Sequence, residues 1–77
     1  MNFNIESNGT VTIHHDRGTT MNFGRINISE FMKKYNQWID GEMIQYAFPE
    51  YTPEQREFIM TGITPEMWNS MFDQRTQ

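Results

Sequence analysis

Metal binding is the first chemistry to consider, because His14, His15 and Asp16 are adjacent in the chain. Neighbouring residues of a β-strand point to opposite faces, so the two imidazoles are expected to diverge. The chain has no cysteine, and no further group of residues has the spacing of a metal-ligand motif. We therefore interpret these residues as the polar end of a strand, and the sequence predicts no metal site.

Catalysis by a nucleophile needs an activated side chain, a base and an orienting group. Ser7, Ser29 and Ser70 lie outside any motif such as G-x-S-x-G. The carboxylates of the second half have the positions of first-turn and surface acids in helices. No glycine-rich segment matches a phosphate-binding loop. The sequence therefore predicts a protein that is not an enzyme and that binds no cofactor.

Charge is unevenly distributed along the 77 residues, whose net charge is −4. Residues 1–39 carry +1 and residues 40–77 carry −5, and acidic regions attract basic surfaces. Two tyrosines of this half fit no apolar stripe and are expected on the surface, where tyrosine often anchors interfaces. The predicted partner-binding residues are Glu50, Glu54, Glu57, Glu66, Asp73, Tyr46 and Tyr51. The alternative is that the acids form only solvated helix faces.

An antiparallel β-meander is predicted over residues 1–24. Polar residues alternate there with the apolar residues Phe3, Ile5, Val11 and Ile13, at the period of a half-buried strand. Ser7-Asn8-Gly9 can close a hairpin over residues 2–15, and a third strand is expected over 19–23. This sheet needs a cover, because a small isolated sheet is marginally stable in water.

A long amphipathic helix over residues 27–40 is the predicted cover. Its apolar residues recur at helical spacing and form one stripe, made of Ile28, Phe31, Met32, Tyr35, Trp38 and Ile39. Asn27 can cap the first turn, with Glu30 three residues later as in a capping box. Gly41 is typical of a position just after a helix end.

Short helices are predicted over residues 42–73, and a repeated tripeptide marks two of their starts. Thr52-Pro53-Glu54 and Thr64-Pro65-Glu66 each supply a capping hydroxyl, a proline at the first helical position and an acid at the positive end of the helix dipole. Ile63 and Trp68 have the positions of a hydrophobic staple. Trp68 is therefore expected to be part of the core, and the alternative is that it lies outside as an anchor for a partner.

A corner at Gly62 joins the last two predicted helices and is comparable to a helix-turn-helix. In that motif the second helix enters the major groove and reads bases with basic or amide side chains. Here the second helix offers Glu66, Asn69, Ser70 and Asp73, with no basic residue before Arg75. Phosphates would repel such a helix, so no direct binding of nucleic acid is predicted.

The second half of the chain resembles a module of small tailed-phage and prophage proteins. The resemblance extends over residues 38–72 and rests on Ile44-Gln45, Ala47-Phe48-Pro49, Arg56-Glu57-Phe58, Thr61-Gly62-Ile63-Thr64, Pro65-Glu66, Trp68 and Phe72. It implies an origin in a phage or mobile element and carries over no catalytic residue. Small acidic phage proteins of this size are often inhibitors of host defence or transcription machinery, anti-CRISPR proteins among them. The resemblance therefore implies an inhibitor, by analogy of size, charge and origin.

Together these features predict one α+β domain over residues 1–77, with a three-stranded antiparallel N-terminal sheet packed by an amphipathic helix and followed by two or three short helices. The predicted function is inhibition of a host nucleic-acid-handling complex by steric and acidic blocking of a basic protein or ribonucleoprotein surface. A phage assembly or self-associating protein, including a homodimer, and a small transcription regulator are the alternatives. No signal peptide or membrane-length apolar run is recognised, so the host cytoplasm is the expected location.

Overall fold

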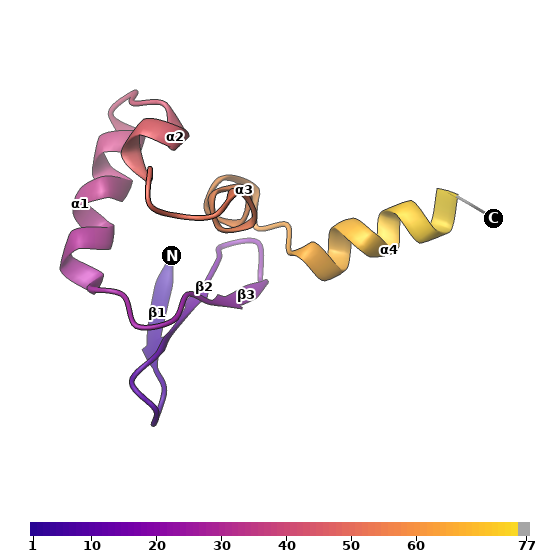
Figure 1. The fold of residues 1–77 in the computed structure, drawn as a ribbon, viewed down its shortest axis with the longest axis horizontal. Helices are drawn as coiled ribbons and strands as arrows, with labels where there is room; N and C mark the ends of the chain where they lie inside the picture. The colour runs from indigo at the N-terminus through magenta and orange to yellow at the C-terminus, as the bar shows by residue number, and fades with distance from the viewer. Residues whose placement is uncertain (76–77) are drawn as a thin grey trace.

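The structure, a computed structural model, describes the backbone of residues 1–75 and the side chains of residues 1–70. Three strands come first, β1 (Asn2–Ile5), β2 (Val11–His14) and β3 (Thr20–Asn22). Four helices follow, α1 (Ile28–Ile39), α2 (Ile44–Ala47), α3 (Pro53–Thr61) and α4 (Pro65–Arg75). Figure 1 shows how the elements are arranged around the sheet. The predicted α+β fold, with an antiparallel three-stranded sheet before short helices, is confirmed.

The sheet has the order β1-β2-β3, and both strand pairs are antiparallel. Phe3 lies opposite Ile13, and Ile13 lies opposite Met21, so their side chains share one face. Gly9 in the β1–β2 turn has a φ of +87°, a conformation that glycine adopts without steric cost. Ile5 is 67% exposed, because the turn end of the hairpin extends beyond the helices (Figure 1). The expectation that Ile5 faces the core is therefore wrong.

α1 lies against the sheet and provides the expected cover. The Asn27 side chain accepts a hydrogen bond from the backbone N–H of Glu30 at 3.0 Å, so the predicted cap is confirmed. Phe31 is completely buried, and its ring centroid lies 5.2 Å from that of Phe48. Ile39 is 60% exposed at the last position of α1. The apolar stripe that packs on the core therefore ends at Trp38, one residue before its predicted end.

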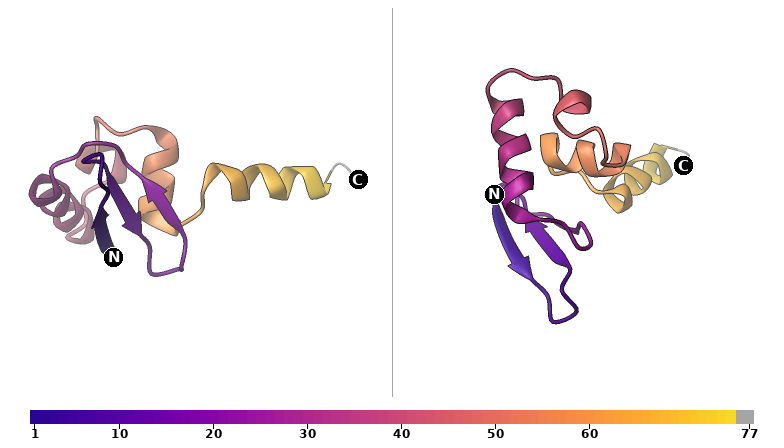
Figure 2. Two further views of the ribbon diagram at one scale, coloured as in Figure 1. Left: turned by 90° about the horizontal axis from the view of Figure 1, so that it is seen from below. Right: turned by 60° about the vertical axis from the view of Figure 1, so that its left-hand side comes forward.

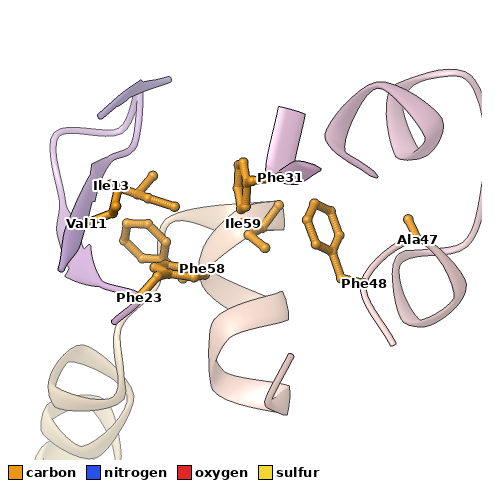
Figure 3. Packing of buried hydrophobic residues seen from close by; sticks show 8 residues of the cluster. All are labelled: Val11, Ile13, Phe23, Phe31, Ala47, Phe48, Phe58 and Ile59. Atoms are coloured by element: carbon orange, nitrogen blue, oxygen red, sulfur yellow. The ribbon is translucent and has the colours of Figure 1, made fainter. Parts of the chain in front are cut away.

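One apolar core joins the sheet to α1, α2 and α3 (Figure 3). Its buried residues are Val11, Ile13, Phe23, Phe31, Ala47, Phe48, Phe58 and Ile59. Phe58 and Ile59 are at most 1% exposed, which confirms the predicted inner face of α3. Apolar burial stabilises by roughly 25 cal/mol per Å², so this cluster is the main source of stability.

The two Thr-Pro-Glu segments both begin helices. The hydroxyl of Thr52 accepts from the backbone N–H of Gln55 at 3.1 Å, and the Gln55 side chain accepts from the backbone N–H of Thr52 at 2.9 Å. At the start of α4, the hydroxyl of Thr64 accepts from the backbone N–H of Met67 at 3.2 Å. Gly62 between the helices has a φ of +77° and ends α3. Both predicted starts and the glycine corner are confirmed.

α4 extends away from the rest of the protein, which we call the body and define as residues 1–62. The left-hand view of Figure 2 shows this helix continuing beyond the other elements. Trp68, in α4, is 49% exposed. Its predicted place in the core is therefore wrong, because the body does not cover the helix that carries it.

Candidate functional site

The corner between α3 and α4 is held against the sheet by the β2–β3 turn. Arg17 donates from Nη1 to the backbone carbonyl of Thr61 at 3.3 Å, and the hydroxyl of Thr19 donates to the backbone carbonyl of Gly62. Carbonyls at the end of a helix have no partner within it. These side chains satisfy two of them and thereby fix the direction in which the chain leaves α3.

A groove of about 400 Å³ lies in the angle between α3 and α4. Its lining residues are Pro53, Glu54, Glu57, Ile63, Thr64, Pro65, Trp68 and Asn69. Apolar atoms form most of this lining, and two carboxylates lie on the α3 side. Two prolines and a capped helix start restrict the backbone here, so the groove is formed before any partner binds.

The acidic side of the groove consists of Glu54 and Glu57, which lie three residues apart on one face of α3. Glu54 is exposed and Glu57 is half-buried. Oε2 of Glu57 accepts a hydrogen bond from the hydroxyl of Thr61 at 2.8 Å, and this bond holds the carboxylate in place. No lysine or arginine side chain within residues 1–70 forms an ion pair with either acid.

Among the other predicted partner-binding residues, Glu50, Tyr46 and Glu66 lie outside the groove. Glu50 is 3.9 Å from the ammonium group of a lysine in α1, and Tyr46 in α2 is 67% exposed. Glu66 is exposed in the first turn of α4. The side chain of Asp73 lies outside the described residues. The structure thus brings two of the predicted acids together in the groove, whereas Glu50 and Glu66 lie outside it.

Tyr51 packs against the core and is not an exposed residue. Its ring centroid lies 5.2 Å from that of Phe48 and 5.8 Å from that of Phe23. Burial raises the pKa of the Tyr51 phenol above its ordinary value of 10.0, and the nearby Glu50 carboxylate adds to the effect. The expected surface position is therefore wrong for this tyrosine, whose ring extends the aromatic core.

The apolar side of the groove was not predicted from the sequence. Ile63 and Trp68 fit a staple, which predicts burial beside the body. A signal was nevertheless present, because Met67 and Trp68 are adjacent and adjacent helical residues point about 100° apart. A narrow buried face of the helix could therefore include only one of these two residues, and the other would be exposed.

The two histidines have packing and surface roles in the structure. His14 is exposed, whereas the His15 ring packs edge-on against Phe58 with centroids 5.7 Å apart. Nδ1 of His15 accepts from the backbone N–H of Arg17 at 3.0 Å. In the part of the chain that the structure describes, no three His, Asp or Glu residues form a group that could hold a metal ion.

Comparisons with protein-family models, with curated proteins and with solved structures found no match to this chain. The resemblance to small phage proteins, the inhibitory function and the partner therefore stay predictions. Among the described helices, none has both the length and the apolar character needed to cross a bilayer.

Proposed function

We propose that this protein is a non-enzymatic binding protein that attaches its acidic corner to a basic surface of another macromolecule. The observation that supports this function is the groove between α3 and α4, where Glu54 and Glu57 lie beside the half-exposed Trp68. Complementary charge speeds the encounter of two proteins. An aromatic residue at the centre of a contact slows their dissociation.

The proposed partner is a host complex that handles nucleic acid, such as a CRISPR effector, and the protein is then a phage-encoded inhibitor in the host cytoplasm. Such complexes have basic channels that hold phosphate backbones. The net charge of −5 over residues 40–77 supports competition for such a channel. α4 adds a steric component, because its 11 residues extend about 16 Å from the corner.

Affinity capture from phage-infected host cells tests this function. Tagged protein should recover a basic host complex, and recovery should fall as salt rises, because salt screens exposed charges. The double variant Glu54→Lys with Glu57→Lys should lose the complex and the inhibitory effect. Glu42→Lys is the matched control, because Glu42 is exposed and lies outside the groove. Recovery of virion proteins alone, or full activity of the double variant, would contradict the proposal.

A second candidate is an assembly protein that associates with itself, and the exposure of Trp68 on α4 favours it. Sedimentation equilibrium of the purified protein distinguishes the two functions. Self-association that Trp68→Ala abolishes would support the assembly role. A monomer at all concentrations, combined with capture of a basic complex, would support the inhibitor.

A further inference from the structure

The groove presents two kinds of surface to a partner. Ile63, Pro65 and Trp68 form an apolar side, and Glu54 and Glu57 form an acidic side. The indole of Trp68 is accessible, since that residue is 49% exposed. A chemical group that packs on the apolar side and also pairs with the acidic side must combine a flat apolar face with positive charge.

The charge of the groove suits a single cation. Glu54 and Glu57 supply two negative charges, and α3 and α4 both begin at the groove, at Pro53 and Pro65. Each helix start is equivalent to about half a positive charge, so the sum is roughly one negative charge. The carboxylates therefore outweigh the helix dipoles, and the groove repels anions although two helix N-termini face it.

We propose that this groove receives the side chain of one arginine of the partner protein, an assignment that rests on the proposed binding function. A guanidinium group is planar and weakly hydrated, and it stacks on an aromatic ring while its N–H groups donate to carboxylates. Thr61 holds Glu57 in position before the partner arrives, so little ordering is needed on binding. A lysine ammonium is compact and strongly hydrated, and it fits the apolar side less well.

The test is an NMR titration of the full ¹⁵N-labelled chain with the peptide acetyl-Gly-Arg-Gly-amide. We expect the arginine peptide to shift the indole N–H signal of Trp68 and the backbone signals of Ile63 and Thr64. The matched lysine peptide should bind about two- to fivefold more weakly, and the matched glutamine peptide should cause no shift. Equal affinity for the arginine and lysine peptides would overturn the assignment, as would the absence of any shift.

Conservative variants separate binding from folding. Replacing Glu54→Gln and Glu57→Gln together should weaken binding of the arginine peptide by about tenfold. The amide oxygen of the glutamine introduced by Glu57→Gln can still accept from the Thr61 hydroxyl, so the corner should keep its structure. Glu50→Gln, outside the groove, is the control and should bind like the unmodified protein. Unchanged binding by the double variant would refute the acidic side of the site.

The arginine assignment and the proposed function can fail separately. Suppose that Trp68→Ala captures the host complex as well as the unmodified protein does, while the double variant Glu54→Lys with Glu57→Lys does not. The groove assignment is then wrong, and the acidic binding function stands. If the arginine peptide binds but no basic macromolecule is captured, the groove assignment is supported and the proposed partner class is wrong.

Discussion

Phe58 and Trp68 lie in two helices that begin in the same way, yet their side chains differ greatly in burial. Both residues are large aromatic side chains in helices that begin with Thr-Pro-Glu. Phe58 is completely buried in the body, whereas Trp68 is 49% exposed on α4. Local signals thus determine where a helix begins, but burial of its apolar face depends on whether another element is available to cover it.

The difference in burial between Phe58 and Trp68 arises because α3 packs beside the sheet and α4 does not. Phe58 of α3 packs against rings from the sheet side, with centroid distances of 5.8 Å to Phe23 and 5.7 Å to His15. α1 and α3 already lie beside the sheet, and α4 continues away from it (Figure 1). We therefore expect the body to unfold as one cooperative unit, and we expect α4 to depend on its capped start and on the corner.

The largest expected effect is that of Phe58→Ala, which removes a ring from the centre of the core. Large-to-small changes of this kind cost about 3–5 kcal/mol. A chain of 77 residues has a total stability of roughly 4–12 kcal/mol, so this loss removes a large share of the free energy of unfolding. Urea denaturation followed by far-ultraviolet circular dichroism measures this cost. A loss below about 1 kcal/mol would contradict the division into body and α4.

Gly62→Ala tests the corner that separates the two regions. An alanine Cβ at this position would lie 2.7 Å from Nδ1 of His15, and the φ of +77° is unfavourable for alanine. We expect a loss of about 1–3 kcal/mol. Gly24→Ala is the matched control, because Gly24 has a φ of +75° but open space around the added Cβ. Equal losses in the two variants would show that contact with His15 contributes nothing.

The paired caps provide the next test. Thr52→Ala should reduce the stability of the body by about 1 kcal/mol, because it breaks a capping box. Thr64→Ala removes the equivalent bond from α4 and should leave the urea midpoint of the body nearly unchanged. Amide hydrogen exchange of α4 should then increase in the second variant only. A similar fall in midpoint for both would mean that α4 unfolds together with the body.

Trp68→Ala should have a smaller effect on stability, below about 1 kcal/mol, since half of its side chain is exposed. Urea denaturation of this variant beside Phe58→Ala measures the contrast directly. Comparable losses from the two substitutions would place Trp68 in the core after all.

The smallest expected effect concerns a surface carboxylate of the body. Hydrogen bonds from Thr12 and Asn4 hold the pKa of Glu6 below its ordinary value of 4.5. Because the pKa is lowered on folding, this stabilisation is present above pH 4.5 and is lost as the pH falls through the lowered pKa. An NMR titration should show the low pKa, and Thr12→Val should raise it towards 4.5. An unchanged pKa in Thr12→Val would mean that Thr12 is not the cause.

Most of the fold could be predicted because its determinants are local. The period of apolar residues predicts the strands and α1, and single residues such as Asn27, Thr52 and Gly62 determine where helices begin or end. Burial at the edges of the core could not be predicted in this way. Ile39 is exposed because α1 extends past the core, and Tyr51 packs on the core because the α2–α3 connection turns back towards it.

The candidate site could be predicted only in part. Charge in the sequence identifies the acids, but it does not show that Glu54 and Glu57 line one groove while Glu50 pairs with a lysine of α1. The apolar side depends on the angle between α3 and α4. That angle depends in turn on Arg17 and Thr19, which lie more than 40 residues earlier in the chain.

The contacts from Arg17 and Thr19 to the end of α3 also have a consequence for redesign. Residues of the β2–β3 turn determine the direction of α4, although none of them lines the groove. Lengthening or shortening that turn would therefore change the angle between α3 and α4, and with it the shape of the groove, without replacing any side chain that lines it. The shape of the groove and the side chains that line it are encoded in separate segments, so each can be varied while the other is kept.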